Sequence, residues 1–275
     1  MMIDIHNHML PGLDDGSPDC EHSLAMARIA VADGIRDVVC TPHWAPGAFE
    51  NTRVPVLRAL KEFQEKLCDN GIPLTVHPGA ELRLDPDLIR KIGSGEILTL
   101  NDTGRFALIE LTDMFLPRNL EVFFRNMLSR GITPIICHPE RNHGLLRDPM
   151  PLFRWVEMGS LVQMTAASVT GRFGSEIRRF SFLLLEHGLA HVLGTDAHDP
   201  RMRTPVLSGG MKEVEGILGR EAADSMVMET PRRIIGGERV IPGAPVPFVN
   251  GPAAASFSPK ISRKIFSLFK TNLGI

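Results

Sequence analysis

One unit recurs along most of this chain: a helix-like segment, a glycine, a short apolar run and then a group of polar residues. In one instance, apolar residues at helical spacing over 20–33 end at Gly34, and an apolar run at 38–41 leads into Pro42 and His43. Short strands that are apolar on both faces and alternate with helices are typical of a parallel sheet covered by helices. The pattern therefore predicts an α/β fold.

Seven strands and five helices are expected from this pattern. The strands are expected at 3–5, 38–41, 74–77, 107–111, 133–137, 161–164 and 190–193. The helices are expected at 20–33, 54–70, 119–130, 151–158 and 174–187. Such units form either an open doubly wound sheet or a closed barrel. No glycine-rich dinucleotide fingerprint follows the first strand, and polar residues gather after nearly every strand, so the barrel is favoured. We expect one barrel domain over 1–241, a size that a single core can support.

The chain changes character after about Pro242. Residues 242–259 are rich in proline, glycine and alanine and are expected to form a linker. Residues 260–275 are basic, with apolar residues at helical spacing, and predict an amphipathic C-terminal helix. Two interpretations stay open for that helix: it docks on its own domain, or it makes a weak contact with an anionic membrane surface or a partner.

Composition narrows the class of protein. A formal net charge of -2 argues against general nucleic-acid binding. The four cysteines form no CxxC pair, which favours reduced thiols in the cytoplasm. No signal peptide is visible, and no apolar run reaches the roughly 18 residues of a membrane span. We expect a cytoplasmic protein, and one that lies against the inner face of the membrane if its tail binds lipid.

The first strand runs into His6 and His8. Alternate residues of a strand point the same way, so both imidazoles can face one point, as transition-metal ligands do. An isolated pair is more often a chance occurrence. Further carboxylates, Asp14 and Asp15, lie in the loop after this strand, however, and imidazoles and carboxylates follow other strands: His43, His77 and Glu81, Glu110, His138, Asp196 and His198. A cluster of carboxylates is costly unless cations hold it together, and so many ligand-type side chains exceed the needs of one ion. The sequence predicts two or three divalent metal ions with a bridging carboxylate.

These motifs resemble those of a known superfamily. They are His6-Asn7-His8, Thr41-Pro42-His43, Gly79-Ala80-Glu81, Ile109-Glu110, His138-Pro139-Glu140-Arg141 and Thr195-Asp196-Ala197-His198. Together they resemble the polymerase-and-histidinol-phosphatase (PHP) superfamily of metal-dependent phosphoesterases. The segments Asp4-Ile5-His6-Asn7-His8, Asp14-Asp15-Gly16, Asn101-Asp102 and His138-Pro139-Glu140-Arg141-Asn142 resemble, within it, the bacterial capsule and exopolysaccharide tyrosine phosphatases. The resemblance implies a distorted (β/α)7 TIM-like barrel with its metal site at the C-terminal ends of the parallel strands.

The resemblance also implies three sets of metal ligands. The first set is His6, His8, Glu81 and Asp196; the second is Glu81, Glu110 and His138, with Glu81 bridging; the third is Asp15, His43 and His198. Asp14 is the rival of Asp15 for the acidic position. His77 matches no ligand of the family and is expected to be a supporting or structural residue. Manganese is the expected metal, and iron or zinc would also suit these ligands.

The resemblance implies that Arg141 and Arg203 bind the substrate phosphate, with Arg201 as the alternative to Arg203. The implied reaction is hydrolysis of phosphotyrosine on a protein, such as a bacterial tyrosine kinase of exopolysaccharide or capsule biosynthesis, by a metal-bound hydroxide. A cysteine-based phosphatase would instead need an arginine six residues after the nucleophile. The residues at that spacing from the cysteines are Met26, Pro46, Leu74 and His143, so the cysteine mechanism is disfavoured.

Three other functions stay open at this point. The same metal centre could hydrolyse histidinol phosphate or another small phosphomonoester. A phosphodiesterase or nuclease is less favoured, because the chain is close to neutral. A non-catalytic, metal-stabilised binding module is a further alternative, although a binding scaffold does not need so complete a set of ligands.

Overall fold

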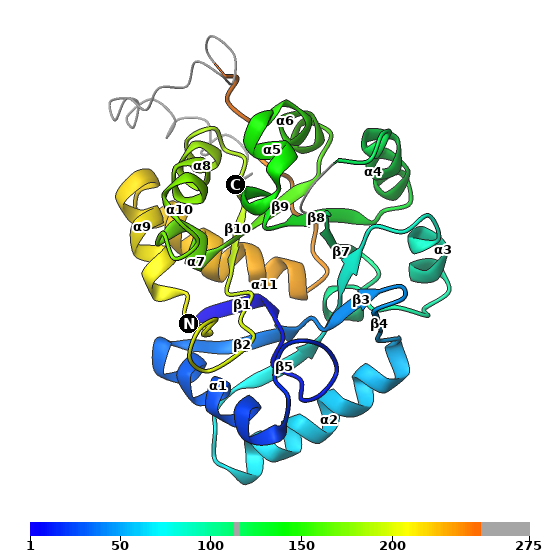
Figure 1. Ribbon diagram of the computed structural model, residues 1–275, viewed down its shortest axis with the longest axis vertical. Helices are drawn as coiled ribbons and strands as arrows, with labels where there is room; N and C mark the ends of the chain where they lie inside the picture. The colour runs from blue at the N-terminus through cyan, green and yellow to red at the C-terminus, as the bar shows by residue number, and fades with distance from the viewer. Residues whose placement is uncertain (113–115, 249–275) are drawn as a thin grey trace.

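The computed structural model describes residues 1–112 and 116–248, and the barrel lies within these ranges (Figure 1). Parallel strands run around it in chain order: β1 (Met2–Asn7), β2 (Ile35–Cys40), β5 (Thr75–Pro78), β7 (Phe106–Glu110), β8 (Thr133–Cys137), β9 (Leu161–Thr165) and β10 (Val192–Gly194). Strands β1, β2 and β5 pair as one sheet, and β10, β9, β8 and β7 belong to another. All seven predicted strands are present. The expected α/β barrel is confirmed.

The barrel is distorted because two of its strands are interrupted. Strand β2 continues as β3 (His43–Ala45), and β5 continues as β6 (Glu81–Arg83). The two continuations pair in parallel, with His43 opposite Glu81, and β6 then pairs with β7. A Cβ on Gly79, at the second interruption, would lie 2.7 Å from a methyl group of Val39. The interruption therefore requires glycine, and it turns Glu81 toward the strand ends.

The ring closes between its first and last strands. Asn7 and Ala197 form an isolated parallel bridge. The amide of Asp196 donates to the carbonyl oxygen of His6 at 2.8 Å, and the amide of His8 donates to that of Ala197 at 2.9 Å. The two ligand-rich segments of the chain, nearly two hundred residues apart, are thus joined by backbone hydrogen bonds.

Helices cover the outside of the barrel. In chain order they are α1 (Cys20–Asp33), α2 (Arg53–Asp69), α3 (Leu88–Gly93), α4 (Leu120–Ser129), α5 (His143–Arg147), α6 (Met150–Glu157), α7 (Ala166–Val169), α8 (Ser175–Glu186), α9 (Ser208–Leu218), α10 (Arg220–Asp224) and α11 (Thr230–Ile235). Helices α1 and α2 pack on β2 and β5, and α4 lies over β8 (Figure 1). The five predicted helices are present with ends within two residues of the expected positions. Helices α9, α10 and α11 were not predicted.

The strands are buried on both faces. In β7, Ala107 and Ile109 belong to the large apolar cluster, whereas Phe106 and Leu108 belong to a smaller one. Glu110 continues the Phe106 and Leu108 face at the carboxyl end of the strand. The near-continuous apolar sequence of these strands follows from this two-sided burial.

The start of the expected linker packs against the barrel. The amide of Val246 donates to the carbonyl oxygen of His187 at 2.9 Å, and His187 Nδ1 lies 2.8 Å from the carbonyl oxygen of Val246. The ring of Phe248 lies 4.2 Å from that of His187. The rest of the expected linker and the expected helix at 260–275 lie outside the described residues. Within the described ranges, no helix has both the length and the apolar character needed to cross a membrane.

Candidate metal centre

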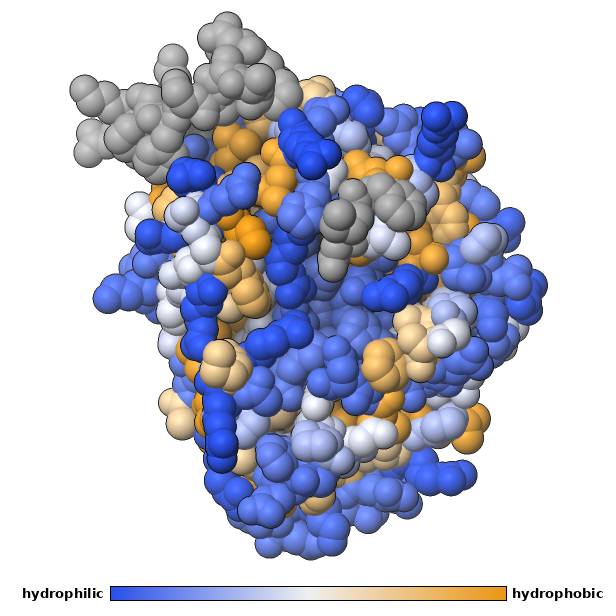
Figure 2. Space-filling model, viewed as in Figure 1, coloured by the Kyte–Doolittle hydropathy of each residue, from blue (hydrophilic) through white to orange (hydrophobic). Residues whose placement is uncertain are grey.

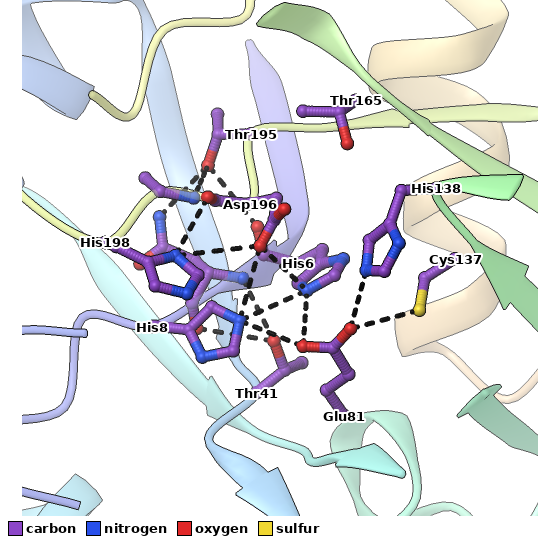
Figure 3. A network of polar contacts seen from close by, with 12 residues as sticks. His6, His8, Thr41, Glu81, Cys137, His138, Thr165, Thr195, Asp196 and His198 are labelled. Atoms are coloured by element: carbon purple, nitrogen blue, oxygen red, sulfur yellow. Dashed lines mark hydrogen bonds and ion pairs between the residues drawn. The ribbon is translucent and has the colours of Figure 1, made fainter. Parts of the chain in front are cut away.

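Histidines and carboxylates from the strand ends meet in one polar cavity of about 320 Å³. The face of the molecule in Figure 2 is hollowed near its centre, where hydrophilic residues gather. Nine of the eleven predicted site residues line the cavity: Asp15, His43, Glu81, Glu110, His138, Arg141, Asp196, His198 and Arg203. The other two, His6 and His8, are fully buried and point toward Glu81 (Figure 3).

Glu81 lies at the centre of the cluster. Its Oε2 atom is 3.1 Å from Nε2 of His6, 3.1 Å from Nε2 of His8 and 3.2 Å from Nδ1 of His43. Its Oε1 atom is 2.7 Å from Nε2 of His138. One buried carboxylate therefore faces four imidazoles, a geometry suited to a ligand shared between metal ions.

Two further groupings extend from this centre. Ligand atoms of His6, His8, Glu81 and Asp196 all lie within 4.8 Å of one another. A second group with the same spacing joins Asp15, His43 and His198, together with His8. The structure thus brings together the first and third ligand sets expected from the sequence.

The second expected set is only partly assembled. Glu81 and His138 are in contact, but Glu110 groups with His43 and Glu81 rather than with His138. The Oε2 atom of Glu110 accepts a hydrogen bond from Nε of Arg83 at 3.1 Å and forms an ion pair with its Nη2 atom, also at 3.1 Å. Arg83 lies in β6, two residues after Glu81, and was not predicted from the sequence. It holds the carboxylate of Glu110 at the rim of the cavity.

Neighbouring side chains fix the orientation of the buried imidazoles. His6 Nδ1 lies 2.8 Å from Oε1 of Gln163, and His8 Nδ1 lies 2.7 Å from Oδ2 of Asp14. Each hydrogen bond leaves the Nε2 atom of its imidazole facing Glu81. Such outer partners orient imidazole ligands and raise their basicity. Asp14 therefore contacts the His8 imidazole on the side that faces away from Glu81.

Asp15, by contrast, faces the cavity. Its Oδ1 atom lies 3.4 Å from Nε2 of His43 and 3.6 Å from Nε2 of His198. Asp14 is instead occupied by His8, by the amide of His43 at 2.9 Å and by the amide of Gly16 at 2.9 Å. Of the two rival carboxylates, Asp15 is the one that the fold turns toward the other ligand-type side chains.

The charges of the cluster keep its central carboxylates ionised. Burial alone would raise the pKa of Glu81 and Asp196. Nearby positive charge more than offsets the effect of burial, and the pKa of each carboxyl lies well below its usual range. The main source of this charge is His6 for Glu81 and Arg141 for Asp196. Burial, with the neighbouring charge of His8, lowers the pKa of His198 to about 2. Glu81 and Asp196 as anions and His198 as a neutral imidazole have the protonation states in which these groups bind metals.

Two arginines reach into the cavity and meet at one atom. Nη2 of Arg141 and Nη2 of Arg203 each lie 2.5 Å from Oδ2 of Asp196. The loop that carries Arg203 is held by Asp199, whose carboxylate accepts hydrogen bonds from the amides of Arg201, Met202 and Arg203. Arg201 is exposed and does not line the cavity. The fold therefore brings Arg203, not Arg201, beside Arg141.

Two site residues have a backbone conformation that favours glycine. His138 has a φ of 34° and Asp196 a φ of 51°. His138 directly follows the end of β8, and Asp196 comes two residues after the end of β10. Such conformations cost free energy and persist where the surrounding structure holds them. At Asp196 the holding groups are visible, because its amide is bonded to the first strand and its carboxylate to both arginines. At this residue the backbone conformation is therefore held by the same contacts that build the cluster.

Two buried carboxylates near the site have structural roles that the sequence did not reveal. Asp4 accepts hydrogen bonds from the amide of Thr195 at 2.9 Å and from its hydroxyl at 2.5 Å, which ties β1 to the segment after β10. Glu140 accepts hydrogen bonds from the amide of Thr165 at 2.9 Å and the hydroxyl of Ser168 at 2.7 Å. The sequence around a carboxylate in a ligand-rich motif does not show whether it binds a metal or accepts hydrogen bonds from backbone amides.

The donor set fits divalent metal ions. Oε2 of Glu81 and Nδ1 of His43 are buried and have no hydrogen-bond partner among the described residues. The two atoms lie 3.2 Å apart, and buried polar atoms without a partner are costly unless another group, such as a cation, satisfies them. Mixed imidazole and carboxylate ligands suit manganese, iron or zinc.

His77 and three of the four cysteines lie outside the cluster. His77 Nε2 is 2.8 Å from Oδ1 of Asp37, and among the described residues no metal-ligand group includes it. All four cysteines are free. Cys137 alone lies in the cluster, where its Sγ donates to Oε1 of Glu81 at 3.2 Å. Burial raises the pKa of the Cys137 thiol well above its usual range, which is the opposite of what a cysteine nucleophile needs.

Comparisons with known proteins agree with this geometry. The chain is 39% identical to the tyrosine-protein phosphatase YwqE of Bacillus subtilis over 202 residues, which are 74% of this chain and 79% of that protein. It is 30% identical to the tyrosine-protein phosphatase CpsB of Streptococcus pneumoniae over 239 residues, 85% of this chain and 98% of CpsB.

Solved structures give the same relationship. A structure from a study of YwqE and CpsB, described as unique metal-dependent tyrosine phosphatases, matches with a TM-score of 0.87 at 34% identity, over 90% of this chain and 100% of its own. A histidinol phosphate phosphatase from Lactococcus lactis matches with a TM-score of 0.52 at 13% identity, over 80% of this chain and 93% of its own. That likeness is one of fold alone. A family model for capsular polysaccharide synthesis, CpsB/CapC, matches residues 2–236. The chain therefore belongs to the CpsB/CapC family.

Proposed function

We propose that this protein removes phosphate from phosphotyrosine on a protein of capsular polysaccharide synthesis, and that the cavity at the barrel's strand ends is where it does so. As a member of the CpsB/CapC family it is a metal-dependent tyrosine-protein phosphatase of capsule synthesis, and its substrate is a phosphoprotein. The proposal concerns which residues of this chain carry the reaction and which protein is the substrate.

Three metal positions are proposed. His6, His8, Glu81 and Asp196 would hold one ion; Glu81, Glu110 and His138 a second; and Asp15, His43 and His198 a third. The short distances from Glu81 to His6, His8, His43 and His138 support a bridging role for this carboxylate. The contact of Asp15 with His43 and His198 supports its assignment over Asp14. We propose manganese as the metal, with iron and zinc as the alternatives that metal analysis would separate.

Bound divalent ions would supply an activated water and would offset the negative charge of the phosphoryl group. The chain itself supplies the rest. Arg141 and Arg203 would bind the non-bridging phosphoryl oxygens, because forked guanidinium groups match that geometry. Their convergence on one oxygen of Asp196 supports this role, since it shows that both side chains reach the same point. Gln163 and Asp14 would hold His6 and His8 in the orientation that ligation needs.

The observation that carries the proposal is the carboxylate of Glu81, buried and facing four imidazoles in a cavity that also holds two arginines. The test is hydrolysis of a phosphotyrosyl peptide by purified protein, after chelation and after each metal is added back, with the metal content measured in parallel. We expect activity to disappear on chelation and return with manganese. Glu81→Ala should lose most of its metal and its activity, whereas Glu62→Ala, an exposed carboxylate on α2, should keep both. Full metal occupancy in Glu81→Ala would contradict the bridging assignment.

A bacterial tyrosine kinase of capsule or exopolysaccharide biosynthesis is the proposed physiological substrate. The chain would meet such a substrate through the barrel at 1–241, with 242–259 as a linker and 260–275 as a basic helix that contacts a membrane surface or the partner. Because Val246 and Phe248 pack on His187, the informative truncation ends at Phe248. Removing residues 249–275 should leave hydrolysis of phenyl phosphate unchanged and weaken association with anionic vesicles. If the full and truncated chains bind vesicles equally, residues 249–275 do not contact the membrane surface.

A further inference from the structure

The cavity at the metal centre has a single apolar wall. Its lining consists of carboxylates, histidines and arginines, apart from Ala48 and Phe49. Both belong to the short hairpin of β3 and β4 (Phe49–Glu50) on the His43 side of the cavity. Apart from the imidazole of His43, so polar a cavity offers this aromatic ring little to pack against, and its place there raises the question of what it contacts in a complex.

The hairpin holds Phe49 in one position. Ala45 pairs with Phe49 and Trp44 with Glu50 across the two strands, and Trp44 is buried in the large apolar cluster. The ring of Phe49 lies nearly parallel to the imidazole of His43, with the planes 16° apart and the centroids 5.8 Å apart. Phe49 itself is only half-buried. The ring is therefore fixed against the metal-ligand cluster and still accessible from the cavity.

The substrate has a matching division into polar and apolar parts. In a phosphotyrosyl side chain the charged phosphoryl group is joined directly to a phenyl ring. With the phosphoryl group beside Arg141 and Arg203, the ring must leave a cavity whose other walls are polar. A phenyl ring gains little from contact with carboxylates, whereas contact with another aromatic ring is favourable.

We propose that Phe49 selects aryl phosphates over alkyl phosphates by packing against the phenyl ring of the substrate phosphotyrosine. The proposal rests on the phosphotyrosine phosphatase function above and adds the residue that recognises the leaving group. A phosphoseryl side chain has only one methylene group after its phosphate oxygen and offers no ring to pack against Phe49. Aromatic contacts of this kind change affinity by roughly three- to tenfold.

Binding and turnover can be measured separately. For binding, phenylphosphonate and methylphosphonate, neither of which is hydrolysed, are titrated calorimetrically into manganese-loaded protein. For turnover, kcat and KM are measured with a phosphotyrosyl and a phosphoseryl peptide of otherwise identical sequence. Phe49→Leu should weaken phenylphosphonate roughly three- to tenfold and leave methylphosphonate unchanged, with the loss on the phosphotyrosyl peptide in KM. Phe49→Trp should restore the preference for the phenyl compound.

Phe173 provides a matched control. Its ring lies 5.4 Å from the guanidinium carbon of Arg141, and it does not line the cavity. Phe173→Leu should affect the two phosphonates equally, because Arg141 contacts the group that they share. If Phe49→Leu also weakens both phosphonates equally, or neither, the proposal is wrong. If wild-type protein hydrolyses no phosphotyrosyl peptide, the proposed function fails, and the two phosphonates still report whether Phe49 recognises the ring.

Discussion

Asp14 contacts the His8 imidazole on the side that faces away from Glu81. Its Oδ2 atom lies 2.7 Å from Nδ1 of that imidazole and 2.9 Å from the amide nitrogen of His43. One carboxylate oxygen therefore positions two neighbouring ligand-type histidines without facing the cavity. Asp14→Ala should lower manganese affinity by roughly 10- to 100-fold while leaving the proposed ligands in place, because the loss of such a partner frees the imidazole to rotate. Metal titration followed by calorimetry would measure this change.

The pair of His77 and Asp37 is the control for that experiment. Its nitrogen and oxygen atoms are 2.8 Å apart, close to the 2.7 Å between Asp14 and His8, but it lies outside the cluster. Asp37→Ala should leave manganese affinity unchanged. Asp15→Ala should also lower the affinity, and in addition change the number of ions bound. If Asp14→Ala bound fewer ions at unchanged affinity, Asp14 would be a ligand rather than a positioning residue.

Cys137 tests the choice between metal and cysteine chemistry. Its thiol donates to Glu81 and to the carbonyl oxygen of Ile109, both at 3.2 Å, and its pKa is raised by burial. Cys137→Ser keeps a donor at this position, so activity on a phosphotyrosyl peptide should stay within about threefold of wild type. Complete loss of activity with normal metal content would support a cysteine nucleophile and contradict the metal mechanism.

The sequence predicted the barrel and the cluster because both depend on local patterns. Strands buried on two faces are apolar throughout, and the carboxyl ends of parallel strands meet at one edge, so the strand pattern alone predicts that residues such as Glu81 and Asp196 lie together. The choice between Asp14 and Asp15 depends instead on which carboxylate the loop turns inward, and no periodicity encodes that orientation.

Residues that act across long sequence separations were the ones missed. Gln163 orients His6, and Arg83 holds Glu110, but each is unremarkable in its own segment. Phe49 follows an interruption in the second strand that the apolar pattern did not predict. Helix α9 was missed for a related reason: its N-terminus is capped by Asp33, at the end of α1, rather than by a neighbour in sequence.

His191 makes the stability of the barrel sensitive to acid. Its Nδ1 accepts a hydrogen bond from the amide of Val162 at 3.0 Å, and its Nε2 is buried with no hydrogen-bond partner among the described residues. Burial lowers the pKa of His191 to about 4. The unfolded chain, with an ordinary histidine pKa, therefore binds more protons as pH falls. This contribution to stability is complete above about pH 6.5 and is lost as pH falls toward 4, by about 2 kcal/mol between pH 7 and pH 5.

Urea unfolding at the two pH values, with chelator present throughout, would measure that loss. Chelation removes the separate effect of pH on metal binding. His191→Gln keeps an acceptor for the amide of Val162 but cannot be protonated, so its unfolding free energy should fall less between pH 7 and pH 5 than that of wild type. Equal falls in the two proteins would show that other groups account for the acid sensitivity.

Asp33 caps the N-terminus of α9, and removing this cap should lower the stability of the protein without lowering its metal content. Oδ2 of Asp33 accepts hydrogen bonds from the amides of Leu207 and Ser208 at 2.7 and 3.0 Å, and the hydroxyl of Ser208 also donates to this carboxylate. Asp33→Ala leaves these donors at the helix N-terminus unsatisfied and should lower the unfolding free energy by about 1–2 kcal/mol. Asp69→Ala, at the exposed end of α2, should have little effect, since Asp69 is 4.0 Å from its nearest cation, Lys66. Denaturation of both variants, with metal content measured beforehand, separates the outcomes: unchanged stability in Asp33→Ala would mean that water caps α9 equally well.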